Sequence, residues 1–316
     1  MTKSLPLVSI ITPPLNSAAY LDAAITSVVR QNYPDIEQLV VDGGSTDGTV
    51  SITRNYKHIT LIQDTGSGIY SAINRGIQSC HGEIIGLLNS DDLYAENALQ
   101  TAVAEFGREA ATDIVYGTAE AFEIDHRGRE RSVLKYPNPA STGKILENMM
   151  FGVPVINACF IRRRVFDELG GFNTQFRLAA DREFLIRAIL VNMKIRCAGQ
   201  VLYRYRIHDD SLTLNKKASN ARVIGYEHMA LAREFMQAST DPRLHRLCER
   251  WYRVSTVTAI AGALREYKLI ETAKIFLEQW ARDLIWPLRM LGIVIEKVAR
   301  RIKNLAGQDV VMTIAL

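Results

Sequence analysis

The stretch GEIIGLLNSDD, residues 82–92, predicts a buried strand that ends in a polar cluster. Its middle is a short, uncharged apolar run, which is typical of a strand in a covered sheet. Two adjacent carboxylates, Asp91 and Asp92, follow directly. Residues 12–16 and 42–47 form similar polar clusters after two other short apolar runs. We therefore expect three strands that each deliver polar side chains at their carboxyl ends.

Strands and helices alternate through the first half of the chain. The expected strands are Val8–Ile11, Gln38–Val41, Ile59–Gln63, Glu83–Leu88 and Asp113–Tyr116. The expected helices are Leu21–Gln31, Thr46–Tyr56, Tyr70–Ser79 and Ala95–Phe106. This alternation predicts an α/β fold with a mainly parallel central sheet covered on both faces. Ligands of such sheets bind at the carboxyl ends of the strands, where the three polar clusters are expected to meet.

The second half of the chain changes character twice. Residues 118–215 are mixed, with expected strands at Glu130–Lys135 and Val201–Ile207 and a helix at Asp181–Leu190. Beyond them the spacing is helical, over Ala221–Gln237, Pro242–Glu266 and Leu269–Trp280. We therefore expect a first domain over residues 1–215, with halves at about 1–117 and 118–215, and a C-terminal α-helical region over residues 216–316.

The composition excludes several classes of protein. Hydrophobic residues make up 47% and charged residues 23% of the 316 residues, which is typical of a folded chain. The four cysteines form no C-x-x-C pair, so zinc knuckles are excluded and reduced thiols in a cytoplasmic setting are expected. The net charge of +4 is too small to predict a nucleic-acid partner. No uncharged apolar run reaches the roughly 18 residues that a membrane-spanning helix needs.

The carboxylate pair Asp91 and Asp92 predicts a site for a hard divalent cation, because Mg²⁺ and Mn²⁺ prefer oxygen ligands. The alternative is a helix N-cap at Asp92, since a helical pattern follows. The cluster DGGSTDGT, residues 42–49, either lets backbone amides approach a ligand or makes a tight turn with Asp47 as cap. It is neither G-x-G-x-x-G nor a P-loop, which disfavours dinucleotide and P-loop nucleotide binding.

A longer series of motifs is more specific than any single cluster. The series comprises VSIITP at 8–13, Asn16, VVDGGSTDGT at 40–49, Gly68-Ile69-Tyr70, Asn74, Gly76, GEIIGLLNSDD at 82–92, RRRVF at 162–166, Gly170-Gly171-Phe172, DREFLIR at 181–187 and Tyr205-Arg206-Ile207-His208. In order and spacing it resembles the family 2 glycosyltransferases, over residues 6–214. The resemblance implies the GT-A fold, with a nucleotide-binding half before an acceptor half. It also implies transfer of a sugar from a nucleotide-diphosphate donor, commonly a UDP-sugar, with inversion at the anomeric carbon.

The resemblance assigns residues to this donor and to a divalent cation, Mn²⁺ or Mg²⁺. The residues assigned to the base and ribose are Thr12, Pro13, Asn16 and Asp42, the last as acceptor of a hydrogen bond from the base. Those assigned to the diphosphate and cation are Asp91 beside ribose and metal, Asp92 as direct metal ligand, Arg206 at phosphate and His208 at the metal or diphosphate. A cation there stabilises the charge that builds on a departing nucleoside diphosphate.

The resemblance assigns the general base to Asp181, with Glu183 as the alternative base. Inversion needs one carboxylate to take the proton of the acceptor hydroxyl. A helix N-cap is the structural alternative for Asp181. Two other functions stay open: a non-catalytic GT-A scaffold that binds a nucleotide sugar or a partner, and a nucleotidyltransferase. The glycine-rich loop with a basic residue that the latter needs near the chain start is not found.

The tail over residues 280–305 carries six basic and two acidic residues, which equals the net charge of the whole chain. Tryptophans and aliphatic residues interleave with these charges, which suits a helix lying in the headgroup region of an anionic membrane. The alternative is a helix packed on the protein with its basic face in water. Because the resembling family often uses lipid-linked acceptors, we expect a cytoplasmic enzyme of cell-surface polysaccharide synthesis, peripherally associated with the inner face of the plasma membrane. Its acceptor is expected to be a glycan or a polyprenyl-diphosphate-linked glycan.

Overall fold

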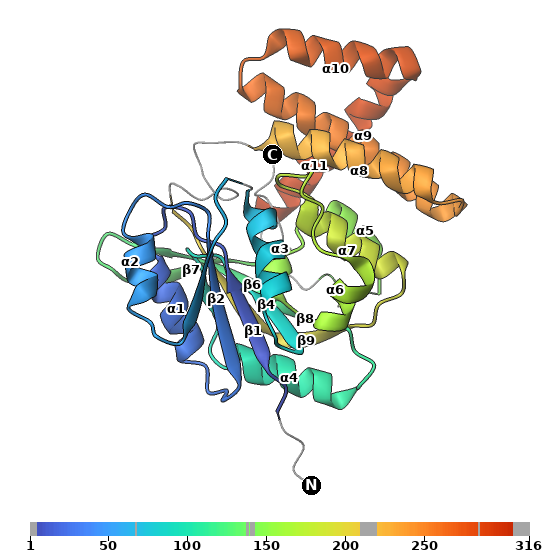
Figure 1. The fold of residues 1–316 in the computed structure, drawn as a ribbon. Coiled ribbons are helices and arrows are strands. Elements are labelled where there is room, and N and C mark those ends of the chain that lie inside the picture. The colour runs from blue at the N-terminus through green and yellow to red at the C-terminus, as the bar shows by residue number, and fades with distance from the viewer. Residues whose placement is uncertain are drawn as a thin grey trace. The chain divides into compact units, whose positions relative to one another are not determined.

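The computed structural model describes residues 5–66, 68–136, 139, 143–208, 220–283 and 285–305. The chain divides into two compact units, Met1–Arg206 and Ile207–Leu316. Figure 1 shows the first unit as a central sheet with helices packed against it, and the second as a group of helices.

A nine-stranded sheet forms the first unit, in the order β3-β2-β1-β4-β8-β6-β9-β5, with β7 paired to β6. The strands are β1 (Val8–Thr12), β2 (Ile36–Asp42), β3 (Ile59–Gln63), β4 (Ile84–Leu87), β5 (Leu93–Tyr94), β6 (Ile114–Ile124), β7 (Glu130–Tyr136), β8 (Cys159–Arg162) and β9 (Ile195–Arg206). Strands β3, β2, β1 and β4 are parallel, and so are β6 and β9. Strand β8 lies antiparallel between β4 and β6. The predicted α/β sheet is therefore confirmed, and β5, β7 and β8 make it a mixed one.

The helices of the first unit fall between these strands. They are α1 (Leu21–Val29), α2 (Thr49–Arg54), α3 (Ile69–Ser79), α4 (Ala98–Arg108), α5 (Ile145–Phe151), α6 (Arg163–Leu169) and α7 (Ala180–Leu190), with a 3₁₀ turn η2 (Ile156–Ala158). The helices expected in the first half form within a few residues of the predicted ends. Helices α5 and α6 and strand β8 were not expected, because segments of four to seven residues carry too little periodicity to be recognised.

Strand β6 extends well beyond its expected end at Tyr116, and β9 begins six residues before its expected start at Val201. Their later halves alternate apolar and charged side chains and pair with one another, with Glu120 opposite Arg204. The short apolar run at 113–116 marked only the fully buried part of β6. The extended part of β6 pairs with the last residues of β9, and Tyr203 and Arg206 of β9 lie at the end of the sheet where β4 delivers its carboxylates.

Close packing of α3 on the sheet depends on Gly76. A β-carbon at this position would lie 2.5 Å from Ile11 Cγ2 and 3.2 Å from Val41 Cγ2. Since such contacts are not tolerated, only glycine lets the helix lie this near to β1 and β2. The first turn of α3, with Tyr70, thereby lies at the carboxyl edge of the sheet.

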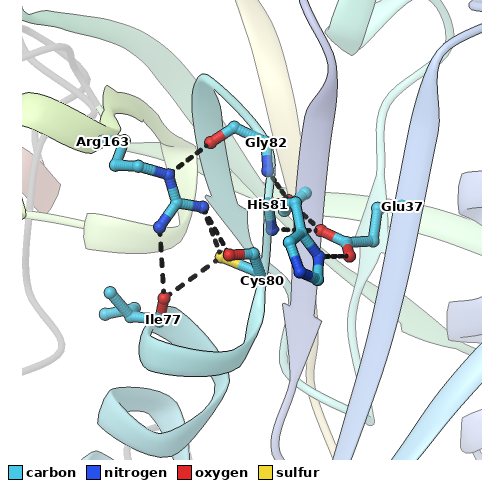
Figure 2. A network of polar contacts seen from close by, with 7 residues as sticks. Glu37, Ile77, Cys80, His81, Gly82 and Arg163 are labelled. Atoms are coloured by element: carbon cyan, nitrogen blue, oxygen red, sulfur yellow. Dashed lines mark hydrogen bonds and ion pairs between the residues drawn. The ribbon is translucent and has the colours of Figure 1, made fainter.

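Two charged side chains, Arg163 and Glu37, hold the turn that leads into β4 (Figure 2). Arg163 donates to the carbonyls of Cys80 at 2.8 Å and Gly82 at 2.9 Å. On the other side, Glu37 accepts from the backbone N–H of His81 at 2.7 Å and from the hydroxyl of Ser9 at 2.5 Å. Burial opposes ionisation of Glu37, but these hydrogen bonds outweigh it and lower the pKa of its carboxyl group. The start of β4 is therefore fixed to both β1 and β2.

The second unit contains the helices α8 (Ala221–Ala238), α9 (Pro242–Arg265), α10 (Leu269–Arg282) and α11 (Trp286–Leu305). Helices α8, α9 and α10 match the expected helices closely. The described part of the unit has a small apolar core composed of Met229, Ala259, Ile260, Ile275 and Trp286. Helices α8 and α9 approach one another at two glycines, Gly225 and Gly262. No helix in the described part of the chain is long and apolar enough to cross a membrane.

The glycine contact predicts the effect of a single methyl group. A β-carbon at Gly225 would lie 2.5 Å from the backbone nitrogen of Ala259, so Gly225→Ala must push α8 away from α9. We expect it to destabilise the helical unit by about 1–3 kcal/mol, the usual cost of overpacking. The control is Gly292→Ala on α11, where nothing lies within 4 Å and the gain in helix propensity makes the change neutral or stabilising. Hydrogen exchange of α8 and α9 measures the difference, and equal protection in both variants would contradict the packing described.

Candidate donor and catalytic site

The carboxylate of Asp92 is fully buried where β4 ends. Its Oδ2 accepts from the Tyr203 hydroxyl at 2.6 Å and from Asn89 Nδ2 at 3.2 Å, and its Oδ1 accepts from the Arg206 backbone N–H at 2.7 Å. Burial, together with the charge of Asp91, raises the pKa of Asp92 well above its ordinary value, and the three hydrogen bonds oppose this rise. The carboxylate therefore points inward, and its oxygens already have partners inside the protein.

Tyr203 of β9 is the hub of this buried network. Its hydroxyl donates to Asp92 and accepts from Asn157 Nδ2 at 3.0 Å and from the Asn89 backbone N–H at 3.2 Å. Burial raises the pKa of Tyr203 well above its ordinary value, so the phenol stays protonated and can donate. Asn157 belongs to η2, so the network joins the end of β4 to two segments of the acceptor half.

Asp91 is the more accessible carboxylate of the pair, because it is partly exposed while Asp92 is not. Arg206 contacts the main chain of Asp91 from the interior of the protein. The Arg206 guanidinium donates through Nε to the Asp91 carbonyl at 3.0 Å and lies 5.0 Å from the ring centre of Phe122. Since Arg206 is largely buried, the structure shows it supporting the Asp91 main chain, and its expected phosphate contact stays a prediction.

The first two polar clusters form one loop assembly. Asn16 has the left-handed φ of 50°, which asparagine tolerates, and its Oδ1 accepts from the Thr46 N–H at 2.9 Å. The Pro14 carbonyl accepts from the Gly43 N–H at 2.9 Å. Pro13 is partly buried between these contacts. A hydrogen bond of 2.7 Å between the Ser90 and Ser17 hydroxyls joins the assembly to the end of β4. The three predicted clusters therefore do meet at one edge of the sheet.

Asp42 and Thr12 each place a buried oxygen in this assembly. Asp42 Oδ2 accepts from the N–H groups of Gly44 at 3.1 Å and Ser45 at 3.0 Å. Its Oδ1 is buried and, within the described residues, has no hydrogen-bond partner, and the same is true of Thr12 Oγ1. A buried acceptor without a partner is costly, so each of these oxygens can take a hydrogen bond from a further donor, such as a water molecule or a ligand.

Asp181 lies in the first turn of α7 and is partly exposed. Its Oδ1 accepts from the Arg182 N–H at 2.7 Å, and the Tyr70 hydroxyl of α3 also hydrogen-bonds to the carboxylate. Burial raises the pKa of Asp181, while the positive charge of Arg182 and these hydrogen bonds hold the rise down. A reachable carboxylate with a raised pKa can take a proton, as a general base must.

Arg182, next to the candidate base, directs its guanidinium to backbone carbonyls of the protein and not to solvent. Its guanidinium donates to the carbonyls of Met149, Met150 and Gly152, at the C-terminal end of α5. Burial lowers the pKa of Arg182 to about 10. The arginine therefore fixes α5 to the start of α7.

Glu183, the alternative base, is engaged elsewhere. It is buried, and its two carboxylate oxygens accept from Arg187 Nε at 2.7 Å and Nη2 at 2.9 Å. Arg187 also donates to the carbonyls of Leu169 and Gly171. Breaking such a pair leaves a buried charge, so Glu183 is better suited to hold α7 in place than to exchange protons.

Tyr70 and Asn74 of α3 connect the two halves of the unit, a role that the motif series did not reveal. Asn74 Nδ2 donates to the Phe172 carbonyl at 2.8 Å, and its Oδ1 accepts from the Phe172 N–H at 2.8 Å. The Tyr70 ring packs on that of Phe172, with centres 5.5 Å apart. A β-carbon at Gly171 would lie 2.4 Å from Asn74 Oδ1, so the glycine is needed for this contact. The motif series included both Tyr70 and Asn74, which indicated that they matter, but it did not predict that they join the two halves.

A cation at the carboxylate pair would need further ligands from outside the pair. In the described part of the chain, no group of three or more His, Cys, Asp or Glu side chains could hold a metal ion. His208 follows Arg206, the last residue of β9, by two positions and belongs to the second unit. Adjacent carboxylates of like charge at Asp91 and Asp92 nevertheless suit a hard cation that takes its remaining ligands from phosphate oxygens and water.

The mixed sheet and its helices form a GT-A fold. The family model described as "Glycosyl transferase family 2" matches residues 9–170, which is about half of the chain. The chain therefore belongs to glycosyl transferase family 2 and is a glycosyltransferase. The inference from the motif series is confirmed.

Named relatives support the same assignment. A PGL/p-HBAD biosynthesis glycosyltransferase of Mycobacterium tuberculosis is 33% identical over 190 residues, 58% of this chain and 69% of the relative. An uncharacterized glycosyltransferase of Rickettsia felis is 30% identical over 264 residues, 80% of this chain and 42% of the relative.

Solved structures share the fold at lower identity. A fragment of S. aureus TarS in complex with UDP-GlcNAc has a TM-score of 0.58 at 18% identity, covering 83% of this chain and 73% of that one. The mannosyltransferase PcManGT of Pyrobaculum calidifontis, in complex with GDP-Man and Mn²⁺, has a TM-score of 0.57 at 20% identity, covering 97% and 89%.

The Tyr203 network predicts the cost of one hydroxyl group. Tyr203→Phe removes the donor to Asp92 and leaves Asn157 Nδ2 and the Asn89 N–H without their acceptor. We expect a loss of about 2–4 kcal/mol in the free energy of unfolding, because each stranded buried group costs about 1–3 kcal/mol. The matched control is Tyr94→Phe, which removes a single 3.0 Å hydrogen bond to the Leu87 carbonyl and should cost about 1 kcal/mol. Denaturant unfolding of both variants tests this, and a smaller loss for Tyr203→Phe than for Tyr94→Phe would refute the hub.

Proposed function

We propose that the protein transfers a sugar from a UDP-sugar to a hydroxyl group of a glycan or lipid-linked acceptor, with inversion at the anomeric carbon. The observation that carries the proposal is Asp181, a partly exposed carboxylate with a raised pKa that Tyr70 holds at the carboxyl edge of the sheet. A scaffold that only binds a nucleotide sugar has no need of such a group. The family membership disfavours the nucleotidyltransferase alternative.

The donor is proposed to bind the loop assembly through its base. Asp42 Oδ1 and Thr12 Oγ1 are buried oxygens without partners in the described residues, and they call for an N–H donor. Uracil offers one at N3, and guanine offers one at N1. Asn16 and Pro13 shape the same assembly and are proposed to contact the base and ribose. TarS with UDP-GlcNAc and PcManGT with GDP-Man show that both nucleotides occur on this fold.

A divalent cation, Mn²⁺ or Mg²⁺, is proposed at the diphosphate. The geometry of the pair favours Asp91 as the carboxylate that meets the cation, because the oxygens of Asp92 are held by Tyr203, Asn89 and Arg206. Direct ligation by Asp92, the role expected from the resemblance, requires its fully buried carboxylate to become accessible to the cation. His208 is proposed as a further contact to the metal or diphosphate. When bound, the cation neutralises charge on the leaving diphosphate.

The proposed chemical step is a single displacement. The acceptor hydroxyl gives its proton to Asp181 as its oxygen attacks the anomeric carbon, and the bond from that carbon to the phosphate oxygen breaks. The nucleoside diphosphate leaves with the electron pair. Arg182 and Tyr70 hold the Asp181 carboxylate in place during this step.

The acceptor and the cellular place are proposed from the tail. Residues 280–305 are basic and rich in apolar side chains, which suits peripheral binding to the anionic inner face of the plasma membrane. A polyprenyl-diphosphate-linked glycan for a cell-surface polysaccharide would be presented at such a surface. The name of the M. tuberculosis relative connects that protein with the biosynthesis of PGL and p-HBAD.

Asp181→Asn tests whether Asp181 acts in proton transfer and not in donor binding. We expect the variant to bind the donor with unchanged affinity and to lose transfer by roughly 100-fold or more, the usual contribution of a general base. Thermal shift over a panel of UDP- and GDP-sugars with Mn²⁺ first identifies the donor, since a ligand raises the apparent melting temperature. Calorimetric titration then measures donor affinity, and nucleoside diphosphate release with acceptor measures transfer. Parallel loss of donor binding and transfer would contradict the assignment of Asp181.

Tyr70→Phe tests the base through its pH dependence. The Tyr70 hydrogen bond lowers the pKa of Asp181, so its removal raises that pKa further. A base acts when deprotonated, and activity is lost as pH falls through its pKa. The acidic limb of kcat/KM should therefore move to higher pH in Tyr70→Phe. Tyr56→Phe, which removes an exposed hydrogen bond to Asp22, should leave the limb where it is. An acidic limb unchanged by Tyr70→Phe would rule out Asp181 as the titrating group.

A further inference from the structure

An apolar surface on the second unit has no part in the chemistry proposed above. The turn between α9 and α10, together with one face of α10, exposes large apolar side chains: Leu264, Tyr267, Leu269, Ile270, Leu277 and Trp280. Tyr267 and Ile270 are each 89% exposed, Leu277 58% and Trp280 46%. Single exposed apolar residues are ordinary, whereas a continuous series of them marks an interaction site.

Helix α10 carries two apolar stripes. Ile275 faces inward and belongs to the core of the unit, and Gln279 one turn later is also buried. The second stripe consists of Ile270, Leu277 and Trp280, with the exposed Ala273 between them, at the three- and four-residue spacing of one helix face. Within the second stripe Trp280 packs edge-on against Phe276, with ring centres 6.1 Å apart. Ile270 and Leu277 are largely exposed, so packing within the unit does not account for them.

The turn before α10 holds its apolar side chains outward. Tyr267 has the left-handed φ of 57°, a conformation that a bulky residue rarely adopts. Two backbone hydrogen bonds fix it, from the Lys268 N–H to the Ala263 carbonyl at 2.9 Å and from the Glu266 N–H to the Gly262 carbonyl at 3.1 Å. Glycine is the usual residue at such a helix end, so a tyrosine that is 89% exposed here has no local structural reason.

The charges around this surface favour an anionic partner. Of its acidic residues, Glu266 and Glu271 are paired with Arg222 of α8, at 2.8 Å and 3.2 Å. Glu278 is exposed, and so are the basic residues Arg265 and Lys274. The unit over residues 207–316 contains seventeen basic and twelve acidic residues, a net charge of +5. Exposed aromatic and aliphatic side chains among basic ones are typical of a surface that lies in lipid headgroups.

We propose that the α9–α10 turn and the exposed stripe of α10 insert into the headgroup region of an anionic bilayer. This surface lies just before the basic tail in the chain, overlaps it only at Trp280, and adds apolar insertion to the tail's electrostatic attraction. The inference rests on the membrane association proposed above and names the residues that enter the lipid. A second copy of the chain is the competing occupant, but an interface between copies is usually poor in lysine.

Trp280 provides a built-in reporter of insertion. Of the three tryptophans, Trp251 and Trp286 are buried at 1% and 3% exposure, so Trp280 on the stripe is the one that lipid can reach. Full-length protein is mixed with vesicles of phosphatidylglycerol and phosphatidylcholine whose acyl chains are brominated. We expect a blue shift and quenching of the emission. Trp280→Phe should bind the vesicles equally well and lose the quenching, and vesicle binding without quenching of Trp280 would overturn the proposal.

Charged substitutions on the stripe test its contribution to binding. Ile270→Glu combined with Leu277→Glu should weaken partitioning to these vesicles by about tenfold or more, because two exposed apolar side chains lose their burial in lipid. The control is Val191→Glu, at a valine on the first unit that is 47% exposed, which should bind as wild type does. Circular dichroism checks that the helices of both variants are intact.

The outcomes separate this inference from the proposals on which it rests. Equal binding by the double variant and wild type refutes the stripe while leaving the tail's membrane association in place. No vesicle binding by wild type refutes both. A dimer in lipid-free sedimentation that the double variant dissociates, without lipid binding, assigns the stripe to a second copy. Nucleoside diphosphate release without vesicles reports on sugar transfer independently of all these results.

Discussion

The donor end of the sheet is organised around one buried carboxylate, that of Asp92. A charge taken out of water at this depth is tolerated only when hydrogen bonds replace its hydration. Those bonds come from Tyr203 and Arg206 of β9 and from Asn89, and Tyr203 is in turn held by Asn157 of η2. The carboxylate is therefore satisfied only when β4, β9 and η2 are all in register. This arrangement keeps the neighbouring Asp91 at the surface, where a ligand can reach it.

A second set of contacts connects the donor half to the candidate base. Asn74 of α3 clamps the backbone of Phe172, Tyr70 packs on its ring, and the Tyr70 hydroxyl reaches Asp181. Gly76 lets α3 lie on β1 and β2, the strands that end at Thr12 and Asp42. One helix thus relates the loop that is proposed to hold the nucleotide to the carboxylate that is proposed to take the proton.

The sequence predicted most of the four parallel strands β1 to β4, because each is a short apolar run. A polar cluster follows β1, β2 and β4. The sequence also predicted that the clusters meet, since parallel strands share one carboxyl edge. It did not predict β8, α5 and α6, which are too short to show a period. Nor did it show which of two adjacent aspartates faces inward, because that depends on Tyr203, more than a hundred residues away. The sequence could not show that Glu183 is a structural residue and not the general base, because its pairing with Arg187 is visible only in the structure. The expected domain boundary at residue 215 and the assigned site roles stay predictions, and the chain divides by its contacts after Arg206.

The central claim is that Asp91 binds the cation while Asp92 stabilises the buried hydrogen-bond network at the end of β4. Calorimetric titration of UDP with and without Mn²⁺ tests it most directly, on wild type, Asp91→Asn and Asp92→Asn, with the melting temperature of each variant measured alongside. We expect Mn²⁺ to tighten UDP binding roughly tenfold or more in wild type, a normal coupling between two ligands. Asp91→Asn should lose this tightening and keep its melting temperature, whereas Asp92→Asn should melt lower and still respond to Mn²⁺. Full Mn²⁺ dependence in Asp91→Asn, with its loss in an Asp92→Asn protein of unchanged stability, would contradict the account.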